Sequence, residues 1–287
     1  MPPGLTLDFF NKAMIQMKLL ASIFITLLTF NAFSQAGKLL WSDEFDSNGL
    51  PDTSTWTFEL GAGGWGNNEV QQYTSLPANV RQENGLLVIE ALKSGPEWTS
   101  ARIISHDKVE FQYGRIVFRA KLPAGSGTWP ALWLLGHNIF TAGWPEGGEI
   151  DVMEHVGKNP GIVHSSLHTA SSFGSTVNTK TIKVDAFDTE FHEYEANWTK
   201  DKIEFRIDGK LFYTYEPLEQ NSSTWPFNQP FFIIINIAMG GNFGSDPQYE
   251  TNGLKNGIDP TLTSARMEVD YVRIYGNESN TSKIILK

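Results

Sequence analysis

The segment Gly148-Glu149-Ile150-Asp151-Val152-Met153-Glu154-His155 places three carboxylates within six residues of an otherwise apolar, strand-like run. Burying three acids side by side costs free energy unless some of them are protonated, paired or hydrogen-bonded. The crowding therefore indicates that these acids are kept for chemistry.

Side-chain parity predicts how this strand is built. Glu149 and Asp151 share one face, because side chains alternate along a strand. Strict alternation would then place Met153 beside the acids and turn Glu154 into the core. A β-bulge at 152–153 adds one residue, so that both apolar side chains face the core and all three acids lie on one face.

This arrangement is typical of a retaining glycosidase. With the bulge, the carboxyl groups of Glu149 and Glu154 are expected roughly 5 to 6 Å apart, the separation at which one acid attacks the sugar and the other transfers the proton. Asp151 would hydrogen-bond the nucleophile and help to separate the two pKa values. Two alternatives are a divalent-ion site, which favours more oxygen ligands from a flexible loop, and a solvated edge strand, which favours polar residues on both faces.

Composition narrows the class of partner. The chain has 287 residues, a net charge of -10, no Cys and 9 Trp. The acidity argues against nucleic acid or an anionic membrane as a partner, and the absence of Cys excludes disulfides and thiolate zinc sites. Abundant Trp favours a flat, neutral ligand such as a polysaccharide. We expect a monomer that is not membrane-bound in its mature form.

The chain is expected to divide into three parts: a secretory signal at 1–35, a catalytic domain at 36–276 and a short polar tail at 277–287 that frays. The signal, read over Lys18 to Ala36, consists of a basic start, an apolar run and small residues around Ala32-Phe33-Ser34. Met14 and Met17 are alternative translation starts. Export implies a secreted or periplasmic protein.

The mature part reads as many short strands with almost no helical periodicity, which predicts one all-β sandwich or barrel. Asp208-Gly209 predicts a tight hairpin with a type I′ turn. The expected strands are Leu86–Leu92, Ala101–Ser105, Gly114–Lys121, Thr128–Leu135, Glu149–Val156, Ile162–Thr169, Phe191–Trp198, Lys202–Tyr215, Phe231–Ala238 and Glu268–Tyr275.

The acid segment resembles the E-[IL]-D-x-x-E signature of glycoside hydrolase family 16, in the bulged form of its laminarinases; lichenases of the family carry an unbulged E-x-D-x-E form. The resemblance covers about Leu40 to Tyr275. It is supported by the segments Trp41-Ser42-Asp43-Glu44-Phe45, Gly66-Asn67-Asn68-Glu69-Val70-Gln71-Gln72-Tyr73, Gly127-Thr128-Trp129-Pro130-Ala131-Leu132-Trp133 and Glu268-Val269-Asp270-Tyr271-Val272.

The resemblance implies a β-jelly-roll sandwich of two antiparallel sheets with an open concave cleft. It implies an endo-β-1,3-glucanase that needs no cofactor for catalysis. Glu149 would be the nucleophile, Glu154 the acid/base and Asp151 the assisting residue.

Three tryptophans are candidate sugar platforms. Trp129 and Trp133 are four residues apart on one strand and so share a face. Parity alone fits core tryptophans equally well, and the resemblance favours sugar platforms. Trp144, in a Gly/Pro-rich loop just before the acid strand, is expected at the cleft rim.

Polar residues of a Gly-rich loop form a second candidate group. Asn67, Asn68 and Glu69 suit sugar hydroxyls, and relatives use this motif near the cleavage point. A plain turn is the alternative, because Asn and Gly often form turns.

Further candidates lie on neighbouring strands. His168 is expected to approach Glu154 and tune its proton affinity if their strands pair. His164 fits a structural role equally well. Arg102 is expected to reach a sugar hydroxyl or pair with a cleft acid, and for Asn236 both cleft and core remain open.

The resemblance also implies a structural calcium ion far from the cleft, held by Glu44, Asp270 and the carbonyl of Gly85. The alternative is an ion pair between Asp270 and a base such as Arg273.

Two other functions remain open beside a glucanase. The first is a glucan-recognition protein that binds without hydrolysis, which the presence of both glutamates disfavours. The second is the same chemistry on mixed-linkage glucan or on a sulfated galactan, and the net acidity disfavours a sulfated chain.

Overall fold

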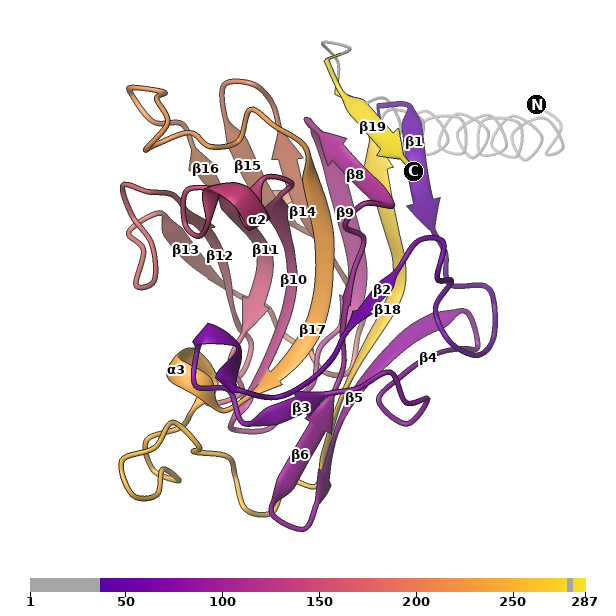
Figure 1. Ribbon diagram of the computed structural model, residues 1–287, viewed down its shortest axis with the longest axis vertical. Helices are drawn as coiled ribbons and strands as arrows, with labels where there is room; N and C mark the ends of the chain where they lie inside the picture. Colours follow the sequence, from indigo (N-terminus) through magenta and orange to yellow (C-terminus); the bar gives the residue numbers. More distant parts are fainter. Residues whose placement is uncertain (1–36, 278–280) are drawn as a thin grey trace, which may run out of the picture. The chain divides into compact units, whose positions relative to one another are not determined.

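Strand β11 (Glu149–His155), which carries the three acids, lies inside a nine-stranded sheet that we call the acid sheet (Figure 1). The computed structural model describes residues 37–277 and 281–287. The expected signal segment and both alternative starts lie outside these residues.

The acid sheet has the strand order β13-β12-β11-β10-β17-β7-β2, with β8 paired to β17 and β19 paired to β8. Its strands run antiparallel throughout. Besides β11 they are β2 (Thr57–Glu59), β7 (Arg102–Ile104), β8 (Val109–Gln112), β10 (Thr128–Gly136), β12 (Ile162–His168), β13 (Thr179–Lys183), β17 (Phe231–Met239) and β19 (Lys283–Leu286).

A second sheet has the order β16-β15-β14-β9-β18-β5-β6-β3, with β1 paired to β18 and β4 to β5. Its pairs are antiparallel except β3 with β6, which run parallel. Its strands are β1 (Leu39–Asp43), β3 (Gln71–Tyr73), β4 (Val80–Glu83), β5 (Leu86–Ser94), β6 (Glu97–Ser100), β9 (Gly114–Lys121), β14 (His192–Trp198), β15 (Ile203–Ile207), β16 (Lys210–Tyr215) and β18 (Ser264–Tyr275).

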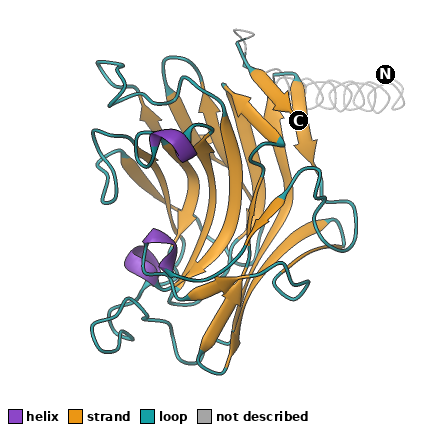
Figure 2. Cartoon of the chain, in the orientation of Figure 1, coloured by secondary structure: helices purple, strands orange, loops and turns teal. Residues whose placement is uncertain are grey.

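In the part of the chain that the structure describes, helical structure is confined to single turns between strands (Figure 2). These turns are η2 (Gly64–Gly66), α2 (Ile139–Ala142) and α3 (Gly241–Gly244). The fold is therefore the predicted all-β jelly-roll sandwich, with one parallel strand pair as its departure from two antiparallel sheets. Within the described residues, no helix is long and apolar enough to cross a membrane.

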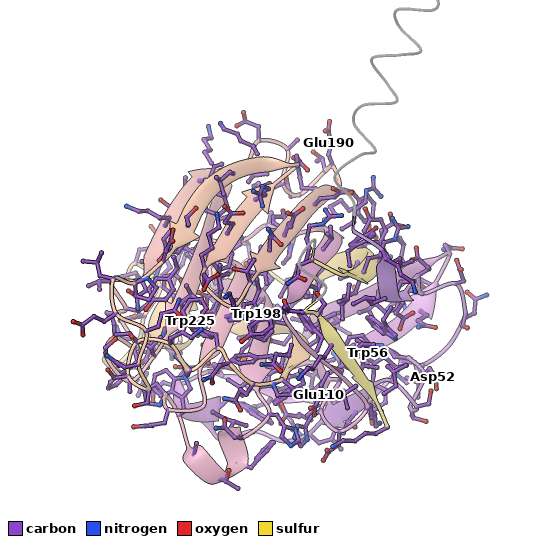
Figure 3. All side chains as sticks on the ribbon, turned by 90° about the horizontal axis from the view of Figure 1, so that it is seen from above. Asp52, Trp56, Glu110, Glu190, Trp198 and Trp225 are labelled. Carbon is purple, nitrogen blue, oxygen red and sulfur yellow. The ribbon has the colours of Figure 1, made fainter. Side chains whose placement is uncertain are left out.

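The core lies between the two sheets. Alternate residues of β17, beginning with Phe231, pack into it, while those between them face the other side of the acid sheet. Trp56 and Trp198 are among the largest fully buried side chains, and both are labelled in Figure 3. Their indole N–H groups donate to Asp43 and to the carbonyl of Phe227, so neither polar atom is left unpaired.

Two local predictions can be compared with the backbone. The hairpin at Asp208-Gly209 is confirmed, with φ values of 50° and 75° that suit a type I′ turn. The prediction that the last residues fray is wrong, because β19 pairs with β8 from Lys283 to Leu286. Ile284 packs against the core, which compensates for ordering the chain end.

Candidate active site

The predicted bulge is present in β11. Asp151 pairs with Ser166 and Glu154 pairs with His164, so two residues of β11 lie opposite Ser165 alone. The register of β11 against β10 shifts at the same place. A β-bulge of this kind bends the strand and changes the direction of the side chains that follow it.

The two residues of the bulge, Val152 and Met153, face the core as predicted. Val152 and Met153 are fully buried among the apolar side chains between the sheets, whereas Glu149 and Glu154 are half-buried. The Ser165 hydroxyl donates a 2.7 Å hydrogen bond to the carbonyl oxygen of Val152, which satisfies a backbone group that the ladder leaves unpaired at the bulge.

Gly148 forms a turn directly before strand β11. Gly148 has a φ of 76°, a conformation that L side chains rarely adopt. A Cβ atom there would lie 2.7 Å from Cγ of Pro226, so a larger residue would displace the entry to the acid strand.

The three carboxyl groups are buried together, which raises the pKa of each. Desolvation, reinforced by the nearby charge of Asp151, raises the pKa of Glu149 to about 8. Desolvation and the charge of Glu154 also raise the pKa of Asp151, and desolvation raises that of Glu154. Glu149 and Asp151 are hydrogen-bonded to each other, so the pair can hold a proton between them.

Two predicted tryptophans donate hydrogen bonds to the two glutamates. The indole of Trp129 donates to Glu154 Oε1 and the indole of Trp144 donates to Glu149 Oε2, both at 3.0 Å. Trp144 is 46% exposed, which agrees with its predicted place at a rim. Each ring can therefore orient a glutamate with its N–H group and offer its face to a ligand.

His168 contacts Glu149 and Asp151 instead of the predicted neighbour Glu154, but its predicted effect on the proton affinity of Glu154 is present. His168 pairs in register with Glu149, and its Nε2 atom lies 3.2 Å from Asp151 Oδ2 and 3.6 Å from Glu149 Oε1. His164 is the residue opposite Glu154, and its ring packs edge-on against Phe243. The charge of His168 still favours the ionised forms of Glu149 and Glu154, lowering the pKa of each against the effect of burial.

Arg102 lies between two aromatic rings on the same face. Its guanidinium carbon is 5.1 Å from the ring centre of Trp65 and 4.8 Å from that of Trp133, and it forms an ion pair with Glu59. This agrees with the expectation that Arg102 pairs with an acid. Both rings lie within cation–π distance of the guanidinium, so Trp133 belongs to a packed group on this face and not to the core between the sheets.

A buried network of hydrogen bonds extends from Trp133 to Glu69. Trp133 donates to Asn236 Oδ1 at 2.8 Å, and Asn236 Nδ2 donates to the hydroxyl of Tyr73 at 3.0 Å. Tyr73 in turn donates to Glu69, which also accepts a 2.6 Å hydrogen bond from Gln71. Asn236 therefore lies on the side of the acid sheet that carries the acids, and both the oxygen and the nitrogen of its side-chain amide are hydrogen-bonded.

The polar residues of the Gly-rich loop, Asn67, Asn68 and Glu69, differ in burial. Glu69 was expected to be open to a sugar but is buried, and this burial raises its pKa. Asn68 is exposed and donates to Asn242 of α3, while Asn67 is half-buried beside Glu69. Glu69 therefore holds the buried network, while the two asparagines donate to Glu69 and Asn242, and their contact with a sugar stays a prediction.

The predicted calcium ligands do not offer free carboxylates. Glu44 accepts two hydrogen bonds from Arg273, at 3.0 and 2.8 Å, and Asp270 forms an ion pair with Arg119. An ion at this place would have to displace both arginines. These residues do not fit a calcium site as arranged, and the alternative of an Asp270 ion pair is supported with Arg119 as the base.

Several residues of the site were not predicted from the sequence. Trp65 and Glu59 complete the group around Arg102, and Phe243 packs against both Trp129 and His164. Trp65 and Phe243 each lie in a short Gly-rich run, and an aromatic residue flanked by glycines was the signal that could have identified them.

Residues 67–273 match the sequence model described as Glycosyl hydrolases family 16. The chain belongs to this family. It is 42% identical over 253 residues to a beta-glucanase of Rhodothermus marinus, covering 83% of this chain and 85% of the relative. It is 38% identical to a glucan endo-1,3-beta-glucosidase of Cryptopygus antarcticus, covering 88% and 97%.

Among solved structures, the laminarinase of Flavobacterium sp. UMI-01 is similar to this family 16 chain with a TM-score of 0.76. The two are 47% identical, and the match covers 83% of this chain and all of the other. The resemblance read from the acid segment is thereby confirmed.

Because the pKa of Glu149 is raised, the stability of this family 16 protein is expected to fall as the pH rises. The folded protein keeps the proton up to about pH 8, whereas the unfolded chain loses it near pH 4.5. The stabilisation from protonated Glu149 is thus complete below pH 4.5 and is lost as the pH rises through 8. The amide of Glu149→Gln does not ionise in this range. The melting temperature of this variant should therefore exceed that of the wild type by an amount that grows as the pH rises.

The upper limit of this effect is about 5 kcal/mol, reached above pH 8. Differential scanning calorimetry between pH 4.5 and 8.5 measures it, with Glu190→Gln as a control because Glu190 is exposed (Figure 3). A difference in melting temperature that stays constant with pH would show that the Glu149 proton is not retained on folding.

Proposed function

We propose that this family 16 protein is a secreted endo-β-1,3-glucanase that hydrolyses laminarin-like polysaccharides with retention of configuration. The observation that carries the proposal is the bulged strand β11, which places Glu149, Asp151 and Glu154 on one face of the acid sheet. Relatives named as a beta-glucanase, a glucan endo-1,3-beta-glucosidase and a laminarinase support the substrate class.

In the first step, the carboxylate of Glu149 attacks the anomeric carbon as the bond to the leaving oxygen breaks. Glu154 gives its proton to that oxygen, so the shortened glucan departs as an alcohol and a glycosyl ester of Glu149 remains. The Trp129 hydrogen bond fixes the direction of the Glu154 carboxyl group. A fixed proton donor is needed because the leaving alkoxide is too basic to depart alone.

In the second step, Glu154, now ionised, takes a proton from water, and the resulting nucleophile attacks the anomeric carbon. The ester bond breaks and Glu149 leaves as a carboxylate. The charge of His168, which lies 3.6 Å from Glu149, stabilises the negative charge that returns to it. Asp151 assists when it holds the proton that the pair shares, because it can then donate a hydrogen bond to the Glu149 carboxylate. Two displacements restore the β configuration without a metal or organic cofactor.

The pKa of about 8 for Glu149 would by itself favour this residue as the proton donor. We assign it the nucleophile role from the family signature and from its neighbours. Trp144 donates a hydrogen bond to its carboxyl group and the charge of His168 lowers its pKa, and both effects suit a group that must act as an anion.

The apolar run followed by small residues before residue 36 supports the proposed secretion, and a neutral substrate suits the charge of -10. The net charge also disfavours an anionic membrane as a partner, and we propose that the mature protein is a monomer. Exposed Trp144 and the half-buried Trp65 and Trp133 beside Arg102 supply aromatic surface for glucose rings.

A product profile on laminarin, lichenan, agarose and carrageenan tests the substrate. We expect oligosaccharides of mixed length from laminarin, slower release from lichenan and none from the two galactans. NMR of the first laminarin products should show the β anomer. Release from a galactan in preference to laminarin would contradict the substrate, and no reducing sugar from any polymer would support a binding protein instead.

A further inference from the structure

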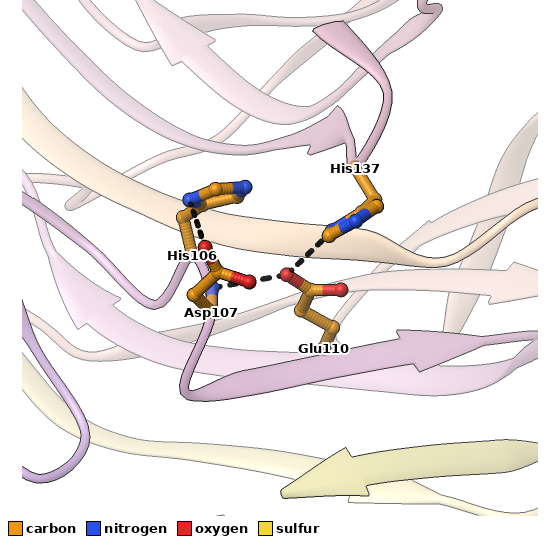
Figure 4. A group of neighbouring side chains, drawn as sticks. All are labelled: His106, Asp107, Glu110 and His137. Atoms are coloured by element: carbon orange, nitrogen blue, oxygen red, sulfur yellow. Dashed lines mark hydrogen bonds and ion pairs between the residues drawn. The ribbon is translucent and has the colours of Figure 1, made fainter. Parts of the chain in front are cut away.

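A second cluster of ligand-type side chains lies outside the three acids. It consists of His106 and Asp107 in the turn between β7 and β8, Glu110 of β8, and His137 just after β10 (Figure 4). One nitrogen or oxygen atom from each of the four lies within 4.8 Å of the others. The proposed hydrolytic mechanism uses none of them.

The distances suit a small cation after modest movement. His137 Nδ1 lies 2.9 Å from Glu110 Oε1, and His106 Nδ1 lies 3.5 Å from Asp107 Oδ2. Ligands of tetrahedral zinc stand about 3.3 Å apart, given metal-ligand bonds of about 2.0 to 2.1 Å. The side chains of His137 and Asp107 are 43% and 57% exposed, so they have room to adjust and leave an entry path.

The charge of Glu110 is the second observation that points to a cation. Its side chain is only 2% exposed, and within the described residues its ion-pair partner is His137 rather than an arginine or lysine. The backbone N–H of Asp107 also donates to it. Burying a carboxylate is costly, and a bound cation would reduce that cost. Lys287 forms an ion pair with Asp107 at the exposed side of the cluster and would have to move aside for Asp107 to bind an ion.

Aromatic packing fixes the orientation of His106, on which the more exposed ring of His137 stacks. The ring of His106 lies 4.8 Å from both Phe140 and Phe232 and stacks on His137 at 5.4 Å. Rings held in this way lose little conformational freedom on binding an ion, which is a feature of built metal sites.

We propose that His106, Asp107, Glu110 and His137 bind a divalent transition metal of the zinc class. Two imidazoles with two carboxylates match the nitrogen and oxygen ligands of zinc, whereas calcium and magnesium prefer oxygen ligands alone. The ion would tie the β7–β8 turn to the segment after β10. That segment continues through α2 to Trp144, the donor to Glu149, so the site would stabilise one flank of the catalytic face.

The test is binding of zinc chloride to the purified protein, after treatment with a chelator and dialysis. Isothermal titration calorimetry should show one equivalent bound at neutral pH, and the melting temperature should rise by several degrees at saturating zinc. The double variant His106→Ala/His137→Ala should lose both effects. His192→Ala is the matched control, because His192 also pairs with a carboxylate, Asp208, but lies outside the cluster.

A second arm separates this site from the acids of β11. Glu149, Asp151 and His168 also bring three ligand atoms within 4.8 Å of one another, so zinc could bind there. We expect the Glu149→Gln variant to keep the full equivalent of zinc and the rise in melting temperature. Loss of binding in that variant, retention in the double histidine variant, or no binding in the wild type would each overturn the proposal.

Cobalt(II) provides a readout of geometry. The cobalt-loaded protein should show the visible absorption of a four-coordinate site, and the double histidine variant should not. A spectrum identical to that of aqueous cobalt would contradict binding by this cluster. These readouts do not depend on glucanase activity, so failure here leaves the proposed function standing.

Discussion

Replacing Glu149 by alanine is expected to lower kcat on laminarin roughly 10⁴-fold or more, because the covalent step loses its nucleophile. The fold should survive, since the variant removes a buried acid whose pKa is raised by the fold itself. Initial rates of reducing-sugar release and a circular dichroism melt measure the two effects. The control is Glu190→Ala at an exposed position. A Glu149→Ala variant within tenfold of the wild-type rate would contradict the catalytic role.

Deleting Met153 is expected to lower laminarin hydrolysis by about 10²-fold or more. The deletion removes the extra residue and produces the unbulged spacing E-x-D-x-E, so all three acids still share a face. The bend of the bulge is lost, however, and Glu154 shifts relative to Glu149. A misplacement of about 1 Å between reacting groups is enough for a loss of this size.

The deletion also removes a buried side chain, so stability must be separated from geometry. Met153→Ala is the matched control, because it creates a comparable loss of packing, about 2 to 5 kcal/mol, while the bulge stays. We expect Met153→Ala to melt at a lower temperature yet keep most of its activity below that temperature. A fully active deletion variant would show that the bulge has no part in catalysis.

The geometry of β11 was predictable because its signal is local. The placement of Val152 and Met153 in the core follows from parity and hydrophobicity, which depend only on neighbours in sequence. The same is true of the turn at Asp208-Gly209, whose residues tolerate positive φ.

Contacts between distant segments were less predictable. The prediction that His168 contacts Glu154 was wrong because the contact depends on the register between β11 and β12, which parity within one strand does not fix. The burial of Glu69 depends on Gln71 and Tyr73 beneath it, and a polar loop sequence does not show this. The C-terminal strand β19 was missed because its pairing with β8 joins residues about 170 positions apart.

The central claim is that Glu149 and Glu154 act from opposite sides of one anomeric carbon, and azide trapping tests it most directly. Each glutamate is replaced by alanine, and an activated aryl laminaribioside is supplied with sodium azide. Azide should enter directly in Glu149→Ala and give the α-glycosyl azide, whereas in Glu154→Ala it should attack the glycosyl ester and give the β-glycosyl azide. A β-glycosyl azide from Glu149→Ala, or an α-glycosyl azide from Glu154→Ala, would contradict the account.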